Sequence, residues 1–320
     1  MAFNNPLLDF TVDNLVSDVQ RRFSGPLTPS LFQQVDFISF LDSELRSDLT
    51  LFIRSAREEY FETVYTTPII QNVVTYAIPY RAIGMTTRKV NLLDPNNNLL
   101  ELVQLSLEDI QLNYVPYSSP FFPNGYYVQN NNVILFPPNL GLNNSYKLQI
   151  VYERRPNSLV SSSVCGQVQS FNATANTAVL TNVPTNWVVG MTFDFYNGYP
   201  PFDSVGDDVQ LTNISGSTLT FSALPTNIAI NQWVSPSMQG CIAQIPYDAY
   251  PLLNQLATMK CVEALGDTAG LQNAEKKYEQ MKVNYKSLQP RMEGEDKILN
   301  NKNTVFGVGR GNMGNYPNAY

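Results

Sequence analysis

The spacing of apolar residues predicts helices in the first part of the chain. Up to about residue 60, apolar side chains recur every three or four positions, which places them on one face of a helix. The three stripes are Val12, Leu15, Val16 and Val19; Leu31, Val35 and Ile38; and Leu45, Leu49, Phe52, Ile53, Ala56 and Tyr60. Residues suited to helix starts precede them, namely Thr11, Thr28 with Pro29, and Asp42. Residues 1–63 are therefore predicted to form N-terminal helices.

The pattern then changes to the alternation of apolar and polar residues that is typical of β-strands. The predicted strands are Val73–Tyr76, Lys89–Leu93, Leu99–Leu105, Tyr126–Gln129, Val133–Phe136 and Leu148–Tyr152. They predict an antiparallel β body over residues 64–162. A second segment, residues 163–242, has its own turn-rich pattern and a tight hairpin at Ile214–Leu219. It predicts a small β-barrel or sandwich that is inserted into the chain and folds as a separate unit.

Helical periodicity returns over residues 243–290. Gly266 suits the end of one helix, and Asp267 or Thr268 suits the start of the next, so the segment predicts a helical hairpin. The first helix carries Leu252, Leu256, Met259, Val262 and Leu265, and the second carries Leu271, Ala274, Tyr278, Met281, Tyr285 and Leu288. The second stripe is longer than a two-helix hairpin needs, so Tyr278, Met281, Tyr285 and Leu288 are a candidate subunit interface; a packing seam within the chain is the simpler alternative.

Residues 291–320 lose this periodicity and are predicted to be a flexible C-terminal arm. The fold class is therefore α+β: N-terminal helices and a C-terminal helical hairpin packed with a β body, plus the inserted barrel and the arm. The arm retains the large residues Val305, Phe306, Tyr316 and Tyr320, which a simple linker does not need. Anchors spaced along an extended segment are suited to docking on a partner.

Charge and composition argue for assembly and against catalysis. The chain has no His, and no Lys or Arg lies between Arg155 and Lys260. A triad, a Cys–His pair or a His metal site cannot be built from it. With a net charge of −7, it is not expected to bind DNA phosphates stably. Amides supply much of the polarity, through 34 Asn; this favours buried assembly surfaces, although a codon bias explains it equally well.

No motif predicts a catalytic residue, a metal site or a cofactor. Gly307–Gly311 has the glycines of a phosphate loop but lacks its flanking strand, helix and Lys-Ser/Thr. Asp203, Asp207 and Asp208 are best interpreted as a solvated turn, because neither calcium-loop spacing nor a second acidic cluster accompanies them. Trp187 and Trp233 are best interpreted as core residues, although stacking on a sugar is the alternative.

The cysteines and the N-terminus indicate a reducing compartment. The three cysteines, Cys165, Cys241 and Cys261, form no CxxC motif and are odd in number. Because the ends of an inserted unit lie close together, Cys165 and Cys241 are predicted to be neighbours that remain unpaired. The chain shows no signal-peptide pattern and no apolar stretch long enough to span a membrane. No membrane contact is expected.

Several short sequence segments, taken with this order of elements, resemble head-to-tail connector (adaptor) proteins of tailed bacteriophages. The resemblance covers most of residues 40–290. These segments are Tyr76–Gly84, Val90–Leu93, Gly125–Val128, Val133–Pro137, Tyr152–Pro156, Ile245–Asp248 and Glu263–Asp267.

The resemblance implies a ring, expected to be a dodecamer, that joins the portal of the phage head to the tail. Its partners would be the portal protein, tail or nozzle proteins and further copies of the chain, with DNA only passing through. The arm residues Val305, Phe306, Arg310, Tyr316 and Tyr320 would contact the portal. The expected location is the virion neck, with assembly in the host cytoplasm. Two alternatives stay open: another neck or tail-tube protein, and a glycan-binding or glycan-cleaving virion protein that uses Trp187, Trp233 and the Asp203–Asp208 loop.

Overall fold

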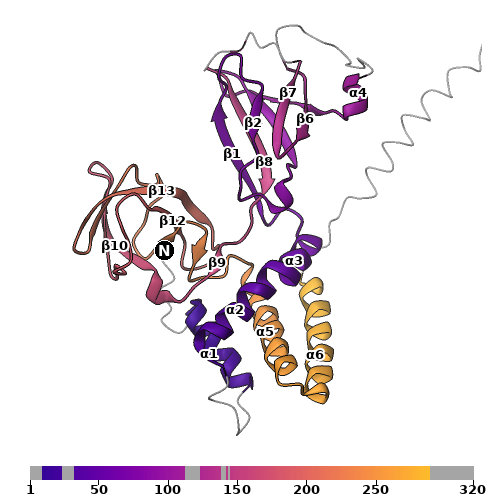
Figure 1. The fold of residues 1–320 in the computed structure, drawn as a ribbon, viewed down its shortest axis with the longest axis vertical. Coiled ribbons are helices and arrows are strands. Elements are labelled where there is room, and N and C mark those ends of the chain that lie inside the picture. The colour runs from indigo at the N-terminus through magenta and orange to yellow at the C-terminus, as the bar shows by residue number, and fades with distance from the viewer. Residues whose placement is uncertain (1–8, 24–31, 112–122, 138–141, 143–144, 289–320) are drawn as a thin grey trace, which may run out of the picture. The chain divides into compact units, whose positions relative to one another are not determined.

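The computed structural model describes residues 9–23, 32–111, 123–137, 142 and 145–288 (Figure 1). Internal contacts distinguish two compact units, Met1–Tyr278 and Glu279–Tyr320. Helices come first, two four-stranded sheets and a closed barrel follow, and helices return after the barrel. This order confirms the predicted α+β class.

The N-terminal helical segment contains one long, uninterrupted stretch. Its elements are α1 (Val12–Phe23), α2 (Gln34–Glu44), the π-helical turn η1 (Leu45–Leu49) and α3 (Thr50–Ala56). The prediction of a new helix at Asp42 is wrong, because α2, η1 and α3 continue through it. The apolar side chains buried along this stretch recur every four residues: Phe37, Leu41, Leu45, Leu49 and Ile53. Because an α-helix has 3.6 residues per turn, such a spacing drifts around the helix, and the wider π-turn returns Leu49 and Ile53 to the buried face.

Two further helical expectations differ from the structure. Val35 is exposed and Ile38 is only half-buried, so their predicted stripe does not form a buried face; its other residue, Leu31, and the predicted start at Thr28–Pro29 lie outside the described residues. The predicted stripe ending at Tyr60 also runs too far, since α3 ends at Ala56. A strand that the pattern did not reveal, β1, begins only a few residues later.

The β body is a pair of four-stranded sheets around one core (Figure 1). The first sheet has the order β1-β8-β3-β4 and the second the order β2-β7-β6-β5. Their bounds are β1 (Glu62–Pro68), β2 (Thr75–Ala77), η2 (Ile83–Met85), β3 (Lys89–Leu93), β4 (Leu99–Glu101), β5 (Val103–Gln104), α4 (Leu107–Gln111), β6 (Gly125–Gln129), β7 (Asn132–Phe136) and β8 (Lys147–Glu153). All pairs are antiparallel except β5 with β6. The single strand predicted at Leu99–Leu105 is divided between β4 and β5, and so joins the two sheets.

Alternation along these strands supplies the core between the two sheets, as the sequence pattern predicted. The core residues, each with no more than 8% of its surface exposed, include Tyr76, Val90, Leu92, Tyr126, Val133, Leu135, Leu148, Ile150 and Tyr152. In the first sheet, Val90 and Leu92 of β3 lie opposite Ile150 and Leu148 of β8, so their side chains share one face. We refer to this body as the sandwich.

The inserted segment forms a closed six-stranded barrel in the order β10-β11-β14-β13-β12-β15. The bounds are β10 (Gly166–Asn172), β11 (Thr177–Leu180), β12 (Thr192–Tyr196), β13 (Ser204–Ser215), β14 (Thr218–Phe221) and β15 (Trp233–Pro236). Phe193, Phe195 and Phe221 fill the interior with Trp187 and smaller apolar residues. The predicted hairpin is confirmed: Ser215 pairs with Thr218, and Gly216 takes the positive φ that this tight connection needs. Closure leaves the barrel without a free sheet edge.

Short elements connect the barrel to the rest of the first unit. They are β9 (Ser158–Leu159), η3 (Ser162–Val164) and β16 (Gln239–Gly240), with η4 (Tyr247–Ala249) following. β9 enters the barrel segment and β16 leaves it, and the two pair with each other in parallel. The chain therefore enters and leaves the barrel at one place, as expected for an insertion.

The C-terminal helices are α5 (Tyr250–Ala264) and α6 (Thr268–Ser287). The predicted connection is confirmed. Gly266 has φ of 71°, its N–H donates to the Glu263 carbonyl, and the Asp267 N–H donates to the Val262 carbonyl. This pattern is a Schellman motif, and Asp267 then caps α6 by accepting a hydrogen bond from the Gly270 N–H.

α5 packs against the N-terminal helices α1 and α2, so the two ends of the sequence contribute to one helical layer. Leu252, Leu253, Leu256 and Ala257 are buried on α5. Leu265, which was predicted to belong to the same stripe, is exposed because it lies at the C-cap.

Candidate functional site

Charged side chains of the sandwich and the barrel meet in one cluster, which we call the arginine–aspartate junction. It consists of Arg81, Arg154, Asp194, Asp207 and Asp208. Arg81, Arg154 and Asp194 are buried, Asp208 is half-buried and Asp207 lies at the exposed rim. The two cations come from the sandwich, and the three carboxylates come from the barrel.

The backbone of the sandwich places the two guanidinium groups next to each other. Arg81 follows β2 in a turn, and Arg154 directly follows β8. Ala82 and Arg154 form an antiparallel bridge, and the Arg155 N–H donates to the Arg81 carbonyl at 2.8 Å. The position of one arginine thereby determines that of the other.

Asp194 is the centre of the cluster. It is fully buried in β12, and Arg81 donates to both of its oxygens, at 2.9 and 2.8 Å, in a fork that matches the carboxylate. The same carboxylate accepts hydrogen bonds from the Asn157 side chain and from the backbone N–H groups of Asp208 and Met238, at 2.9–3.0 Å. A buried charge with this many partners is well satisfied.

A β-bulge brings Asp207 and Asp208 to the same side as Asp194. Phe193 pairs with Val209, but Phe195 pairs with Gly206, so two residues of β13 lie opposite the single residue Asp194 of β12. Adjacent residues of a regular strand point to opposite faces, and the extra residue removes that alternation. Asp208 takes a φ of 56° there, which an Asp tolerates better than most residues.

Each of these two aspartates binds an arginine. Asp208 accepts hydrogen bonds from Arg81 at 2.7 Å and from the Tyr80 hydroxyl at 2.6 Å, and Ser237 donates to it as well. Asp207 accepts from Arg154 at 2.7 Å. The interpretation of Asp207 and Asp208 as a solvated turn is therefore wrong: they are strand residues held by ion pairs. The sequence pattern missed them because a bulge leaves no signal in residue spacing.

These contacts shift the pKa values of the groups that they join. Burial alone lowers the pKa of Arg81, but the hydrogen bonds and charges of Asp208 and Asp194 outweigh it and raise the pKa overall. Burial raises the pKa of Asp208, but hydrogen bonds from Arg81, Ser237 and Tyr80 outweigh it and lower the pKa overall. Both groups are therefore charged at neutral pH, and the junction is an ionic contact.

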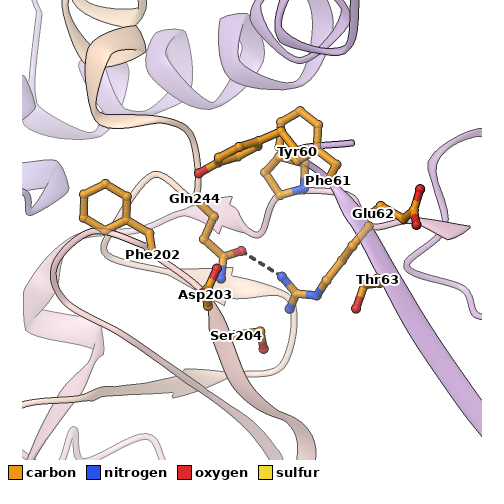
Figure 2. Close-up of a pocket in the computed structure, with 10 residues that line it drawn as sticks. Tyr60, Phe61, Glu62, Thr63, Phe202, Asp203, Ser204 and Gln244 are labelled. Carbon is orange, nitrogen blue, oxygen red and sulfur yellow. Dashed lines mark hydrogen bonds between the residues drawn. The ribbon is translucent and has the colours of Figure 1, made fainter. Parts of the chain in front are cut away.

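A pocket of about 380 Å³ lies beside the junction (Figure 2). Its lining residues are Tyr60, Phe61, Glu62, Thr63, Arg154, Pro156, Phe202, Asp203, Ser204 and Gln244. The dashed contact in Figure 2 is the 3.0 Å hydrogen bond from Arg154 to Gln244. Arg154 already forms an ion pair with Asp207 and donates a hydrogen bond to Gln244, so its donors are engaged within the chain. The pocket adjoins the start of β1, which contributes Glu62 and Thr63.

The residues proposed for a sugar-binding alternative are not assembled into a site. Trp187 is buried in the barrel interior, where its ring lies 4.5 Å from that of Phe193. Trp233 is half-buried in β15. Trp187 therefore has no exposed face on which a sugar could stack, and Asp207 and Asp208 are occupied by arginines.

The residues of the predicted subunit interface differ in exposure. Tyr278 and Tyr285 are buried, Met281 is half-buried and Leu288 is 61% exposed. Of the four, Leu288 and Met281 have the most surface left for a second copy. The predicted portal contacts Val305, Phe306, Arg310, Tyr316 and Tyr320, like the Gly307–Gly311 motif, lie outside the described residues.

Within the described part of the chain, no three His, Cys, Asp or Glu side chains gather closely enough to hold a metal ion. Among the described helices, none is both long and apolar enough to cross a membrane.

Ion pairs and packed β units are the main features of the described structure. A family model described as SU10 adaptor protein matches residues 10–196, from α1 to the end of β12. The chain belongs to this family, and it is a phage structural adaptor protein and a virion component. The match includes Arg81, Arg154 and Asp194. A search among curated proteins finds no match to the chain.

We predict that Arg81→Ala destabilises the fold by about 3–5 kcal/mol, because it leaves Asp194 charged, buried and without its main partner. Chemical denaturation followed by fluorescence and circular dichroism measures this loss. Arg46→Ala is the matched control: Arg46 pairs with Asp42 at an exposed site, so its loss is expected to cost about 0–1 kcal/mol. Equal effects of the two substitutions would contradict the structural role given to Arg81.

We also predict that the stability contributed by Asp208 disappears in acid. Its pKa is lower in the fold than in the unfolded chain, where the pKa of an Asp is about 3.9. The contribution is therefore complete above that pH and is lost as the pH falls through the lower folded-state pKa. Asp208→Asn should lower the melting midpoint at neutral pH, and its difference from the natural chain should shrink in acid. Asp203→Asn, which removes an exposed carboxylate of the same segment, is the matched control.

Proposed function

We propose that the chain assembles as a ring that connects the portal of a tailed phage head to the tail and lets DNA pass. Membership in the adaptor family supports the connecting role. The ring is supported by the two free edges of the first sheet. β1 and β4 lie at opposite ends of the order β1-β8-β3-β4, and within the described residues neither has a second neighbour in that sheet.

Both edges carry exposed apolar side chains. Val64 and Tyr65 on β1 are 52% and 43% exposed, and Leu99 and Leu100 on β4 are 55% and 50% exposed. Tyr65 pairs with the buried Ile150, and Leu100 pairs with the buried Leu92. Tyr65 and Leu100 therefore extend the core face of the sheet to its two edges, where exposed apolar side chains on an unpaired strand favour contact with a partner.

The strand directions suit repetition from copy to copy. Each pair from β1 through β8 and β3 to β4 is antiparallel, so β1 and β4 run in opposite directions. If β4 of one copy lies beside β1 of the next, the alternation continues without a break. A contact between two different surfaces, repeated around an axis, generates a ring when the rotation closes.

Two further regions complete the proposal. The end of α6, with the half-buried Met281 and the exposed Leu288, offers a second contact between copies. The other two predicted interface residues, Tyr278 and Tyr285, are buried and leave little surface for that contact. The arm residues Val305, Phe306, Arg310, Tyr316 and Tyr320 dock on the portal.

A net charge of −7 favours a channel that does not retain DNA, because phosphate is repelled from an acidic wall.

We predict that Tyr65→Asp and Leu100→Asp each abolish the ring, because a charge placed on a packed apolar contact is costly unless it is paired. Mass photometry of the full chain, alone and with the portal protein, measures the loss. Val188→Asp is the control, since Val188 is 59% exposed, no less than Tyr65 or Leu100, but lies on the barrel segment.

A mixture of the two variants tests whether the contact is head-to-tail. Each variant keeps one intact edge, so the mixture should give a dimer but no ring. If either variant alone dimerises through its remaining edge, the contact joins like edges instead. Rings of the normal size from both variants would contradict the edge contact and leave the α6 seam, tested by Met281→Asp, as the proposed interface.

We predict that deletion of residues 301–320 leaves the melting transition unchanged but abolishes attachment to the portal. The deletion removes the proposed anchors and none of the residues that the structure describes. Co-sedimentation with portal particles measures attachment. A second variant, in which Phe306, Tyr316 and Tyr320 are replaced by Ser in the full-length chain, separates loss of anchors from loss of length. Normal attachment of both variants would refute the docking role of the arm.

A further inference from the structure

The two ends of the barrel segment bring a pair of cysteines together. Cys165 immediately precedes β10 and Cys241 immediately follows β16, and both are fully buried. The Tyr196 hydroxyl oxygen lies 3.7 Å from the Cys165 sulfur and 3.6 Å from the Cys241 sulfur. The prediction that Cys165 and Cys241 are neighbours is thereby confirmed. The third cysteine, Cys261, belongs to α5 and is also buried.

The Tyr196 side chain contacts both cysteines at the base of the barrel. It belongs to β12 and is fully buried, and the Cys241 N–H donates to its hydroxyl oxygen at 2.9 Å. The oxygen is thus a shared contact for both sulfurs and for the backbone that leaves the barrel. Both sulfurs contact the same oxygen, and the Cys241 thiol also forms a hydrogen bond with Cys165, so the two thiols are neighbours.

The environment keeps the Cys241 thiol protonated at neutral pH. Burial raises the pKa of Cys241 well above its usual value, and a hydrogen bond with Cys165 raises it further. Because the thiolate is the reactive form, oxidation is slow, and the pair stays reduced wherever thiols are kept reduced. The pair therefore has the proximity for a disulfide but reacts only on prolonged exposure to an oxidant.

We propose that Cys165 and Cys241 form a redox-modification site, in which a two-electron oxidant joins them in a disulfide across the base of the barrel. The two thiols lose two protons and two electrons as the S–S bond forms. With an azo oxidant such as diamide, one sulfur adds to the N=N bond. The second sulfur then attacks the first, the S–N bond breaks, and both protons end on the resulting hydrazine.

The bond would close a loop that contains every strand of the barrel, because one cysteine lies before the first strand and the other after the last. Such a closure removes conformations from the unfolded chain and stabilises the barrel against opening at its base. The interface between the barrel and the sandwich need not change, since neither cysteine belongs to the arginine–aspartate junction.

The test oxidises the folded full-length chain with diamide, denatures it and counts free thiols with N-ethylmaleimide. We expect the count to fall from three to one, with Cys165 and Cys241 linked in the peptide map and all three thiols restored by dithiothreitol. The melting midpoint of the oxidised chain should rise. Persistence of three free thiols, both in buffer and in urea below the unfolding transition, would overturn the proposal.

Two controls separate native geometry from chance pairing. Cys261→Ala should still form the bond, whereas Cys165→Ala should neither lose thiols nor gain stability after oxidation. Oxidation of the unfolded chain should instead favour Cys241 with Cys261, because these two are closer in sequence and shorter loops close more readily. A folded chain that links Cys261, or that links two copies, would also contradict the proposal.

Discussion

The barrel needs positive charge from outside its own sequence, and the arrangement of the first unit depends on that need. Its segment contains no Lys or Arg, yet Asp194 is fully buried in it. Water cannot neutralise a carboxylate at such a site, and the cost of burial is met only by a paired cation with complete hydrogen bonding. Arg81 of the sandwich meets this requirement by binding Asp194, and Arg154, which directly follows β8, binds Asp207 beside it. The stretch of sequence without Lys or Arg thus supplies the anionic half of an ionic contact.

Periodicity in the sequence predicted much of the fold, because alternation and helical spacing reflect which side chains face a core. Lys89–Leu93, the barrel with its Gly216 hairpin and the Gly266 helix end follow from local patterns of this kind. The π-turn at Leu45–Leu49 and the bulge opposite Asp194 do not, since each inserts one residue into a regular element. The sequence pattern also did not predict strand β1. Most side chains of this edge strand are exposed, so buried and exposed positions do not alternate along it.

The candidate site was less predictable than the fold. The sequence showed that cations are missing from one segment and that Asp207 and Asp208 are adjacent, but not that a bulge would turn both toward Arg81 and Arg154. Tertiary pairing of β12 with β13 determines that geometry. Conversely, the two cysteines could be placed together in advance, because a compact insertion must leave the body close to where it entered.

The division of charge between sandwich and barrel has a consequence for the exchange of modules between related chains. A recombination event that transfers only the barrel would deliver three carboxylates to a host surface without the two arginines that receive them. The graft would be tolerated only where the recipient already has guanidinium groups at equivalent positions. The five residues of the arginine–aspartate junction must therefore be inherited together, although more than a hundred residues separate Arg81 from Asp194 in the sequence.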